Sequence, residues 1–173
     1  MNPEPRPFEI INAMASERRG RSDQALLDEL GELPPLADED DASWDDPTYW
    51  VRVAYPYLAL VQLAAERRLR PAIRPLLDHA CFGDPGEIMR GLRHALEAIV
   101  NPDWSVLADI CIEAAQTERP GTILWSVDQL VVLDDERARP LLLTLGASSY
   151  DEIKWRAQAA IERLDEQARR RRT

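Results

Sequence analysis

The order of apolar and polar residues follows the period of an amphipathic α-helix along most of the chain. In the N-terminal third, this period predicts one helix over 8–19 and a second from Ser22 or Asp23 to about residue 31. A longer helix is predicted over 48–68, and it should be central because residues 57–65 are apolar nearly all round. Pro56 should kink it, since proline lacks the N–H group that a helix interior needs.

A repeated pattern begins at residue 70. The motif Arg-Pro-Leu-Leu occupies 74–77 and recurs at 139–142, an offset of 65 that further matches preserve. Helix-start signals, at 84–87, 101–103 and 149–152, separate the apolar stretches. We therefore predict three helical hairpins, formed by 70–81 with 85–100, by 102–116 with 121–133, and by 136–146 with 150–169. Each would expose an apolar stripe that a neighbouring hairpin can cover.

The segment 84–96 resembles the second helix of a HEAT-type repeat. It places an aspartate at the turn, Arg90 six positions later and an Ala-Leu pair on the face expected to be buried. Pro75 and Pro140 match the proline in the first helix of such repeats, whereas Trp155 stands in the third hairpin where Arg90 stands in the first. The resemblance implies an all-α fold, a short right-handed α-solenoid of antiparallel helix pairs.

These patterns predict a single helical domain over 1–173. Its N-terminal part, 1–69, holds the first helices and an acidic loop at 33–46, and 70–173 holds the three hairpins. The length of 173 residues and the 45% apolar content are enough for one hydrophobic core.

The net charge of −10 is concentrated in one place. Residues 22–50 contain ten acids and no Lys or Arg. A nucleic-acid partner is therefore disfavoured, because phosphate binding requires clustered cations. The longest uncharged run is too short to cross a membrane, and the N-terminus lacks the apolar stretch of a signal peptide. We expect a cytoplasmic protein with no membrane partner, and the two cysteines fit a reducing compartment.

Candidate catalytic and metal-ligating residues are few. The soft metal ligands are His79, Cys81, His94 and Cys111, and their spacing matches no zinc motif. Cys111 falls on a predicted apolar face and is expected in the core. The acidic pairs at 45–46 and 134–135 stand where helices should begin, so capping explains them. The sequence has no glycine-rich phosphate loop and no nucleophile motif, so we expect no enzyme, no metal and no cofactor.

Two surfaces are candidates for partner binding. The acidic loop suits a basic partner, because opposite charge steers encounter and aromatic residues supply contact area; the alternative is a solvated linker. A row on the second helices of the hairpins either lines a groove or packs between hairpins. The loop candidates are Asp38, Glu39, Asp40, Asp41, Trp44, Asp45, Asp46 and Trp50, and the row consists of Arg90, Trp125 and Trp155.

Together these features favour a non-enzymatic protein-binding module. Its most concrete form is a bacterial immunity or antitoxin-type inhibitor that covers a basic partner protein, such as a toxin domain. A cytoplasmic adaptor or assembly factor is the alternative within the binding class. The alternative from another class is an enzyme on a HEAT-like scaffold, of the lyase or base-excision glycosylase type.

Overall fold

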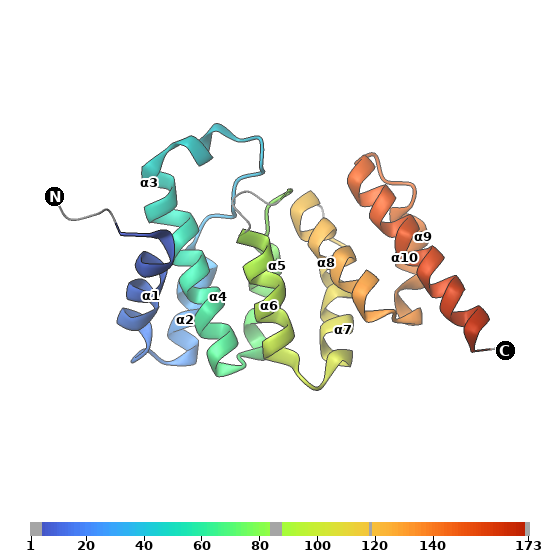
Figure 1. Ribbon diagram of the computed structural model, residues 1–173, viewed down its shortest axis with the longest axis horizontal. Helices are drawn as coiled ribbons and strands as arrows, with labels where there is room; N and C mark the ends of the chain where they lie inside the picture. Colours follow the sequence, from blue (N-terminus) through green and yellow to red (C-terminus); the bar gives the residue numbers. More distant parts are fainter. Residues whose placement is uncertain (1–4, 84–87, 118, 172–173) are drawn as a thin grey trace. The chain divides into compact units, whose positions relative to one another are not determined.

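The computed structural model describes residues 5–83, 88–117 and 119–171, and every regular element within them is helical (Figure 1). The chain divides into two compact units, Met1–Asn101 and Pro102–Thr173. None of the helices in the described part of the chain is long and apolar enough to cross a membrane.

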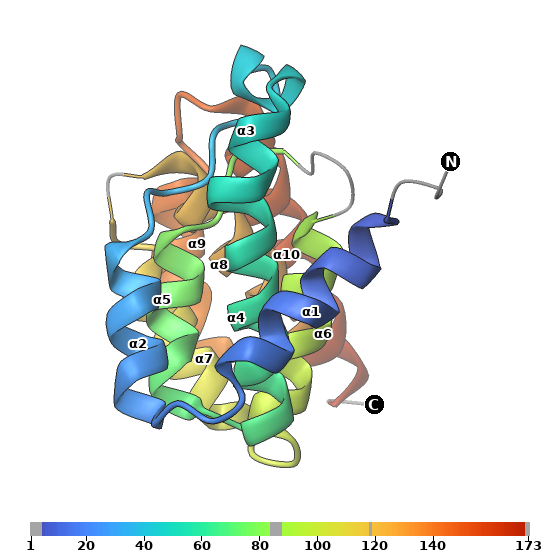
Figure 2. The ribbon, with the colours of Figure 1, turned by 90° about the vertical axis from the view of Figure 1, so that its left-hand side faces the viewer.

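The first unit has two helical layers. Helix α4 (Tyr55–Arg67) packs against α1 (Pro7–Arg18) on one side and α6 (Ile88–Val100) on the other. Helices α2 (Asp23–Glu32) and α5 (Ile73–Asp78) lie side by side in the other layer (Figure 2). The prediction that the segment 57–65 is central is confirmed, because most of its side chains are buried in α4.

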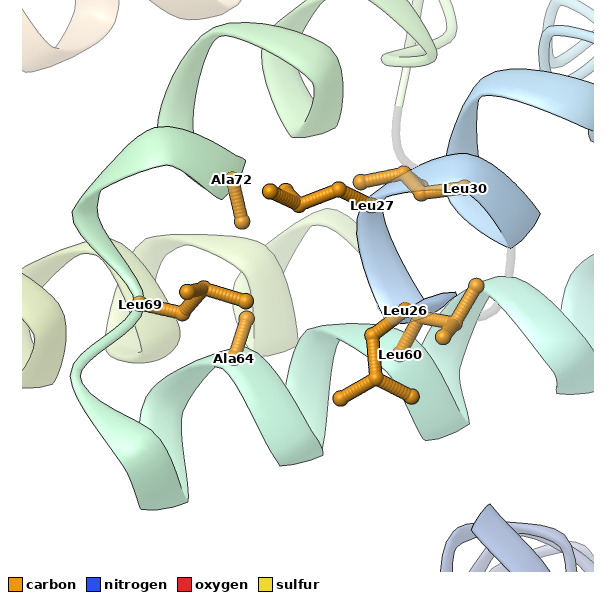
Figure 3. A pocket seen from close by; sticks show the side chains of 7 residues that line it. All are labelled: Leu26, Leu27, Leu30, Leu60, Ala64, Leu69 and Ala72. Atoms are coloured by element: carbon orange, nitrogen blue, oxygen red, sulfur yellow. The ribbon is translucent and has the colours of Figure 1, made fainter. Parts of the chain in front are cut away.

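A small apolar cavity lies where the two layers of the first unit meet (Figure 3). It measures about 10 Å³ and is lined by Leu26, Leu27 and Leu30 of α2, Leu60 and Ala64 of α4, and Leu69 and Ala72 of the following turn. Its lining residues are all apolar, so we regard it as a packing defect of the core rather than a ligand site.

The second unit is built around α8 (Pro120–Leu133). Helix α8 packs against α7 (Trp104–Ala114) and α10 (Asp151–Arg170), and α9 (Arg139–Leu145) packs against α10. Side chains on almost every face of α8 are buried, whereas α10 buries one stripe and exposes the rest.

The same order of local features occurs in both units. Helices α4 and α8 each end on a residue in the left-handed conformation, Arg68 with φ 51° and Asp134 with φ 53°. Each is followed by a 3₁₀ turn, η3 (Arg70–Ala72) or η5 (Glu136–Ala138), and then by a short helix that carries the Arg-Pro-Leu-Leu motif. The 65-residue offset found in the sequence therefore corresponds to equivalent local structure.

The all-α class is confirmed, and the described helices lie close to the predicted ranges. The predicted start signal at 84–87 lies outside the described residues. The start signal at 149–152 includes a capping-box pattern with Ser149 as the cap, and this detail is wrong: α10 begins at Asp151 and has Tyr150 at its N-cap without a side-chain cap. The Tyr150 N–H group donates to Ser148 Oγ at 3.2 Å. The solenoid arrangement and the single domain stay predictions.

Candidate functional site

The first limb of the acidic loop is fastened to the chain segment that follows α5. The Leu36 N–H group donates to the His79 carbonyl oxygen at 3.1 Å, and the Glu39 N–H group donates to the Phe82 carbonyl oxygen at 2.9 Å. Asp38 Oδ1 accepts the Phe82 N–H group at 2.7 Å, and the Leu36 side chain is only 3% exposed. This limb is therefore folded against the core, and whether the loop binds a partner or is a solvated linker stays a prediction.

The second limb contains two helical turns that begin on loop acids. Asp41 Oδ1 accepts the Ser43 N–H group at 2.8 Å and caps η1 (Ala42–Asp45). Asp46 Oδ1 accepts the Thr48 N–H group at 2.8 Å and caps α3 (Pro47–Tyr49). Hydrogen bonding to Ser43 lowers the pKa of Asp41, so this cap stays ionised. The capping role predicted for the 45–46 pair is confirmed for Asp46.

Four aromatic side chains form a half-buried cluster at the base of the loop. Trp44 lies edge-on to Tyr49 and Trp50, with ring centroids 4.9 and 5.2 Å apart, and Trp50 is 5.6 Å from Tyr55. The indole N–H group of Trp44 donates to the Asp38 carbonyl oxygen at 2.9 Å, and that of Trp50 donates to the Trp44 carbonyl oxygen at 2.8 Å. The two indole rings are thus held in place by their own N–H groups, and all four rings keep part of their surface open to solvent.

The helix predicted over 48–68 is interrupted beside this cluster. Between α3 and α4, residues Trp50–Ala54 form a π-helical turn, in which the Tyr55 N–H group bonds to the Trp50 carbonyl oxygen. The turn lies directly before Pro56, the residue that cannot donate a helical hydrogen bond. The kink predicted at Pro56 therefore takes the form of a π turn, and Trp50 lies at the start of this turn, close to the end of the acidic loop.

The loop exposes its acids without cationic partners among the described residues. Asp38, Glu39, Asp40, Asp41, Asp45 and Asp46 are all exposed. None of the five aspartate carboxylates forms an ion pair with a described Arg or Lys. Glu39 is not included in this statement, because it takes part in a further interaction. The carboxylates of Asp40 and Asp45 also form no hydrogen bond with another described residue. The result is a surface of one charge sign on a fixed backbone.

The residues of the predicted second surface differ in exposure. Arg90 lies on the exposed face of α6, and Trp155 of α10 is 60% exposed, with the Arg156 guanidinium 5.3 Å from its ring centroid. Trp125, in contrast, is 8% exposed. Trp125 is therefore not accessible beside Arg90 and Trp155, and its burial favours the packing alternative. Its helix, α8, is buried on nearly every side, which the sequence spacing did not reveal.

The thiols and histidines give no sign of a reactive or metal centre. Cys81 and Cys111 are buried and unbridged, and burial raises the pKa of Cys111 to about 12. The core position predicted for Cys111 is confirmed. Within the part of the chain that the structure describes, no group of His, Cys, Asp and Glu side chains could hold a metal ion.

The sequence pattern does not predict an open hollow in the first unit. It lies over α4, between α1 and α6, and its lining includes Ile11, Leu58, Val61 and Ala95. Gly91 contributes to its width, because a Cβ atom there would meet only Leu58 Cδ2, at 3.7 Å. The hollow is open, and Gln62, Glu66 and His94 also line it.

Comparison of the chain with protein-family models, curated proteins and solved structures finds no match.

Proposed function

We propose that this chain is a non-enzymatic protein-binding module whose acidic loop contacts a basic surface of a partner protein. The observation that supports the proposal is that exposed acids without a cationic partner among the described residues lie on a backbone that is fixed on two sides. A rigid charged surface binds with less loss of conformational freedom than a mobile tail does. The neighbouring aromatic cluster adds the kind of contact area that is enriched in interface cores.

The most concrete form of this function is inhibition. A bacterial immunity or antitoxin-type protein covers the active or docking surface of a toxin, and such a surface is often basic when the toxin acts on nucleic acid. An acidic surface of this kind can compete for it, because its carboxylates mimic the charge that the partner binds.

Two matched charge variants test the proposal. Asp40→Asn with Asp45→Asn removes two loop charges that have no structural bond to described residues. Glu17→Gln with Glu162→Gln removes two charges elsewhere that are also exposed, and these also form no ion pair with described residues. Binding of a synthetic arginine-rich peptide is measured by calorimetry at several salt concentrations.

The loop variant should bind the peptide about fivefold more weakly and with a smaller salt dependence, because each exposed ion pair contributes up to about 1 kcal/mol. The control variant should bind like the wild type. Equal losses in both variants would show that only net charge matters and would contradict a site at the loop.

A further inference from the structure

A buried histidine connects the acidic loop to α5. His79 is 8% exposed and follows the last residue of α5. Its ring Nδ1 atom lies 2.7 Å from the Pro75 carbonyl oxygen, and its Nε2 atom lies 2.8 Å from the Leu33 carbonyl oxygen. The Tyr57 ring stacks on it, with centroids 6.3 Å apart. The imidazole therefore bridges the end of α5 and the first residue of the loop.

Both atoms that the ring contacts are carbonyl oxygens, and carbonyl oxygens only accept hydrogen bonds. A neutral imidazole carries one N–H group, so it can donate to one of the two carbonyls while its other nitrogen directs a lone pair at the second. An imidazolium ring carries two N–H groups and satisfies both. The geometry is therefore complete only when the ring is doubly protonated.

The rest of the loop attachment lies within four residues of this bridge. The backbone carbonyl of His79 accepts the Leu36 N–H group, and Phe82 exchanges two hydrogen bonds with Asp38 and Glu39. Loss of the Leu33 contact would thus free the start of a limb whose next bonds are formed to the same short segment. The first limb has one further anchor, the Ala37 N–H group, which donates to the Tyr49 hydroxyl oxygen at 2.7 Å.

We propose that His79 is the positioning residue of the acidic loop, and that protonation of its ring at both nitrogens fastens the loop. The consequence for partner binding rests on the proposed function, but the bridge itself does not. Because only the doubly protonated ring can donate to both carbonyl oxygens, the loop should be held more firmly at acid pH than at alkaline pH.

The ionisable groups around the bridge belong to several elements. On α5, Asp78 pairs with Arg74, and on α4 the Tyr57 hydroxyl donates to the Leu76 carbonyl oxygen. From the loop, Asp38 is the carboxylate bonded to Phe82, and Glu32 at the end of α2 is exposed. The Cys81 thiol contacts the Gly83 carbonyl oxygen, and the charged side chains of η3 and α6 nearest in sequence are arginines, namely Arg70, Arg90 and Arg93. His94 on α6 is the second histidine, 71% exposed, and serves as the control.

The test is native-state amide hydrogen exchange of the full chain, followed by NMR at pH 5.5 and pH 8 and corrected for the intrinsic effect of pH. In the wild type, protection of the Leu36 and Glu39 amides should fall about tenfold at pH 8, since one hydrogen bond of the bridge is lost. The Leu60 amide in α4 should not change. Equal protection of the loop amides at both pH values would overturn the proposal.

Two variants distinguish the effect of the ring nitrogens of His79 from the effect of the ring's shape. His79→Phe keeps an aromatic ring beside Tyr57 but removes both donors, so its Leu36 and Glu39 amides should exchange fast at both pH values. His94→Phe should behave like the wild type. If His79→Phe does not fold, the comparison of wild-type protein at two pH values still decides the question.

The arginine-rich peptide then distinguishes the two proposals. Weaker peptide binding by His79→Phe than by His94→Phe supports a positioning role for His79 in the binding site. Loop amides that respond to pH in a protein that never binds the peptide would support the bridge and contradict the proposed function. If the wild type binds the peptide but its loop amides are equally protected at both pH values, the result would support the proposed function and contradict the bridge.

Discussion

Replacing Arg68 by glycine should stabilise the first unit. Arg68 ends α4 in the left-handed conformation, with φ 51° and ψ 46°, and its N–H group closes the helix by bonding to the Ala64 and Ala65 carbonyl oxygens. An L-residue with a Cβ atom is strained in this conformation, whereas glycine adopts it freely and is the usual residue there. The Arg68 side chain is exposed and forms no hydrogen bond or ion pair with described residues, so its removal sacrifices no specific contact.

The expected gain follows from two opposing terms. The left-handed conformation costs a non-glycine residue roughly 1–2 kcal/mol. Glycine has more conformational freedom to lose on folding, which takes back about 0.5–1 kcal/mol. Arg68→Gly should therefore raise the free energy of unfolding by about 0.5–1 kcal/mol, and Arg68→Ala, which keeps the Cβ atom, should not raise it.

Urea denaturation measures the difference. The midpoint of Arg68→Gly should rise with an unchanged m value, because the exposed surface of the unfolded chain is the same. Asp134 offers a contrast at the same φ: its carboxylate pairs with Arg163 at 2.7 Å, so Asp134→Gly should lose this contact and gain little. A midpoint for Arg68→Gly at or below that of Arg68→Ala would refute the argument.

Two further predictions concern buried and exposed side chains. Trp125→Ala should lower the free energy of unfolding by about 3–5 kcal/mol because it leaves a cavity, whereas Trp155→Ala should lower it by less than about 1 kcal/mol. Similar losses for the two variants in urea titrations would contradict an effect of the difference in burial. Neither thiol should react with a disulfide reagent in native protein at pH 8, since burial raises the pKa of Cys111 and both cysteines are buried; reaction of one thiol before unfolding would show local opening.

The helices could be predicted because local signals define them. Ser22 accepts the Ala25 N–H group at 3.2 Å and starts α2 as its residue type suggests. The Arg-Pro-Leu-Leu motifs also lie on equivalent short helices, so the offset of 65 carried structural information. The left-handed end at Arg68 was not predictable from its residue type, because arginine, unlike glycine, asparagine and aspartate, is not enriched in this conformation.

The two tryptophans show that helical periodicity alone does not predict the exposure of a side chain. Helical spacing places Trp125 and Trp155 equivalently on their helices, yet one is buried and the other exposed. Periodicity fixes the direction of a side chain relative to its own helix axis, whereas exposure also depends on what packs against that face. Helix α8 is covered on nearly every side and α10 is not, and no local pattern encodes this difference.

Some carboxylates of the acidic loop hold its backbone and others do not, and the difference shows which of them can be assigned to partner binding. Asp38, Asp41 and Asp46 bond to backbone N–H groups, so their presence follows from the need to hold turns. Asp40 and Asp45 form no such bond with described residues, and they add like charge to a crowded segment, which disfavours the compact state. Folding alone does not explain them. Residues that break a folding rule without a local gain concentrate at functional sites, so these two carboxylates are where the binding proposal is most directly tested.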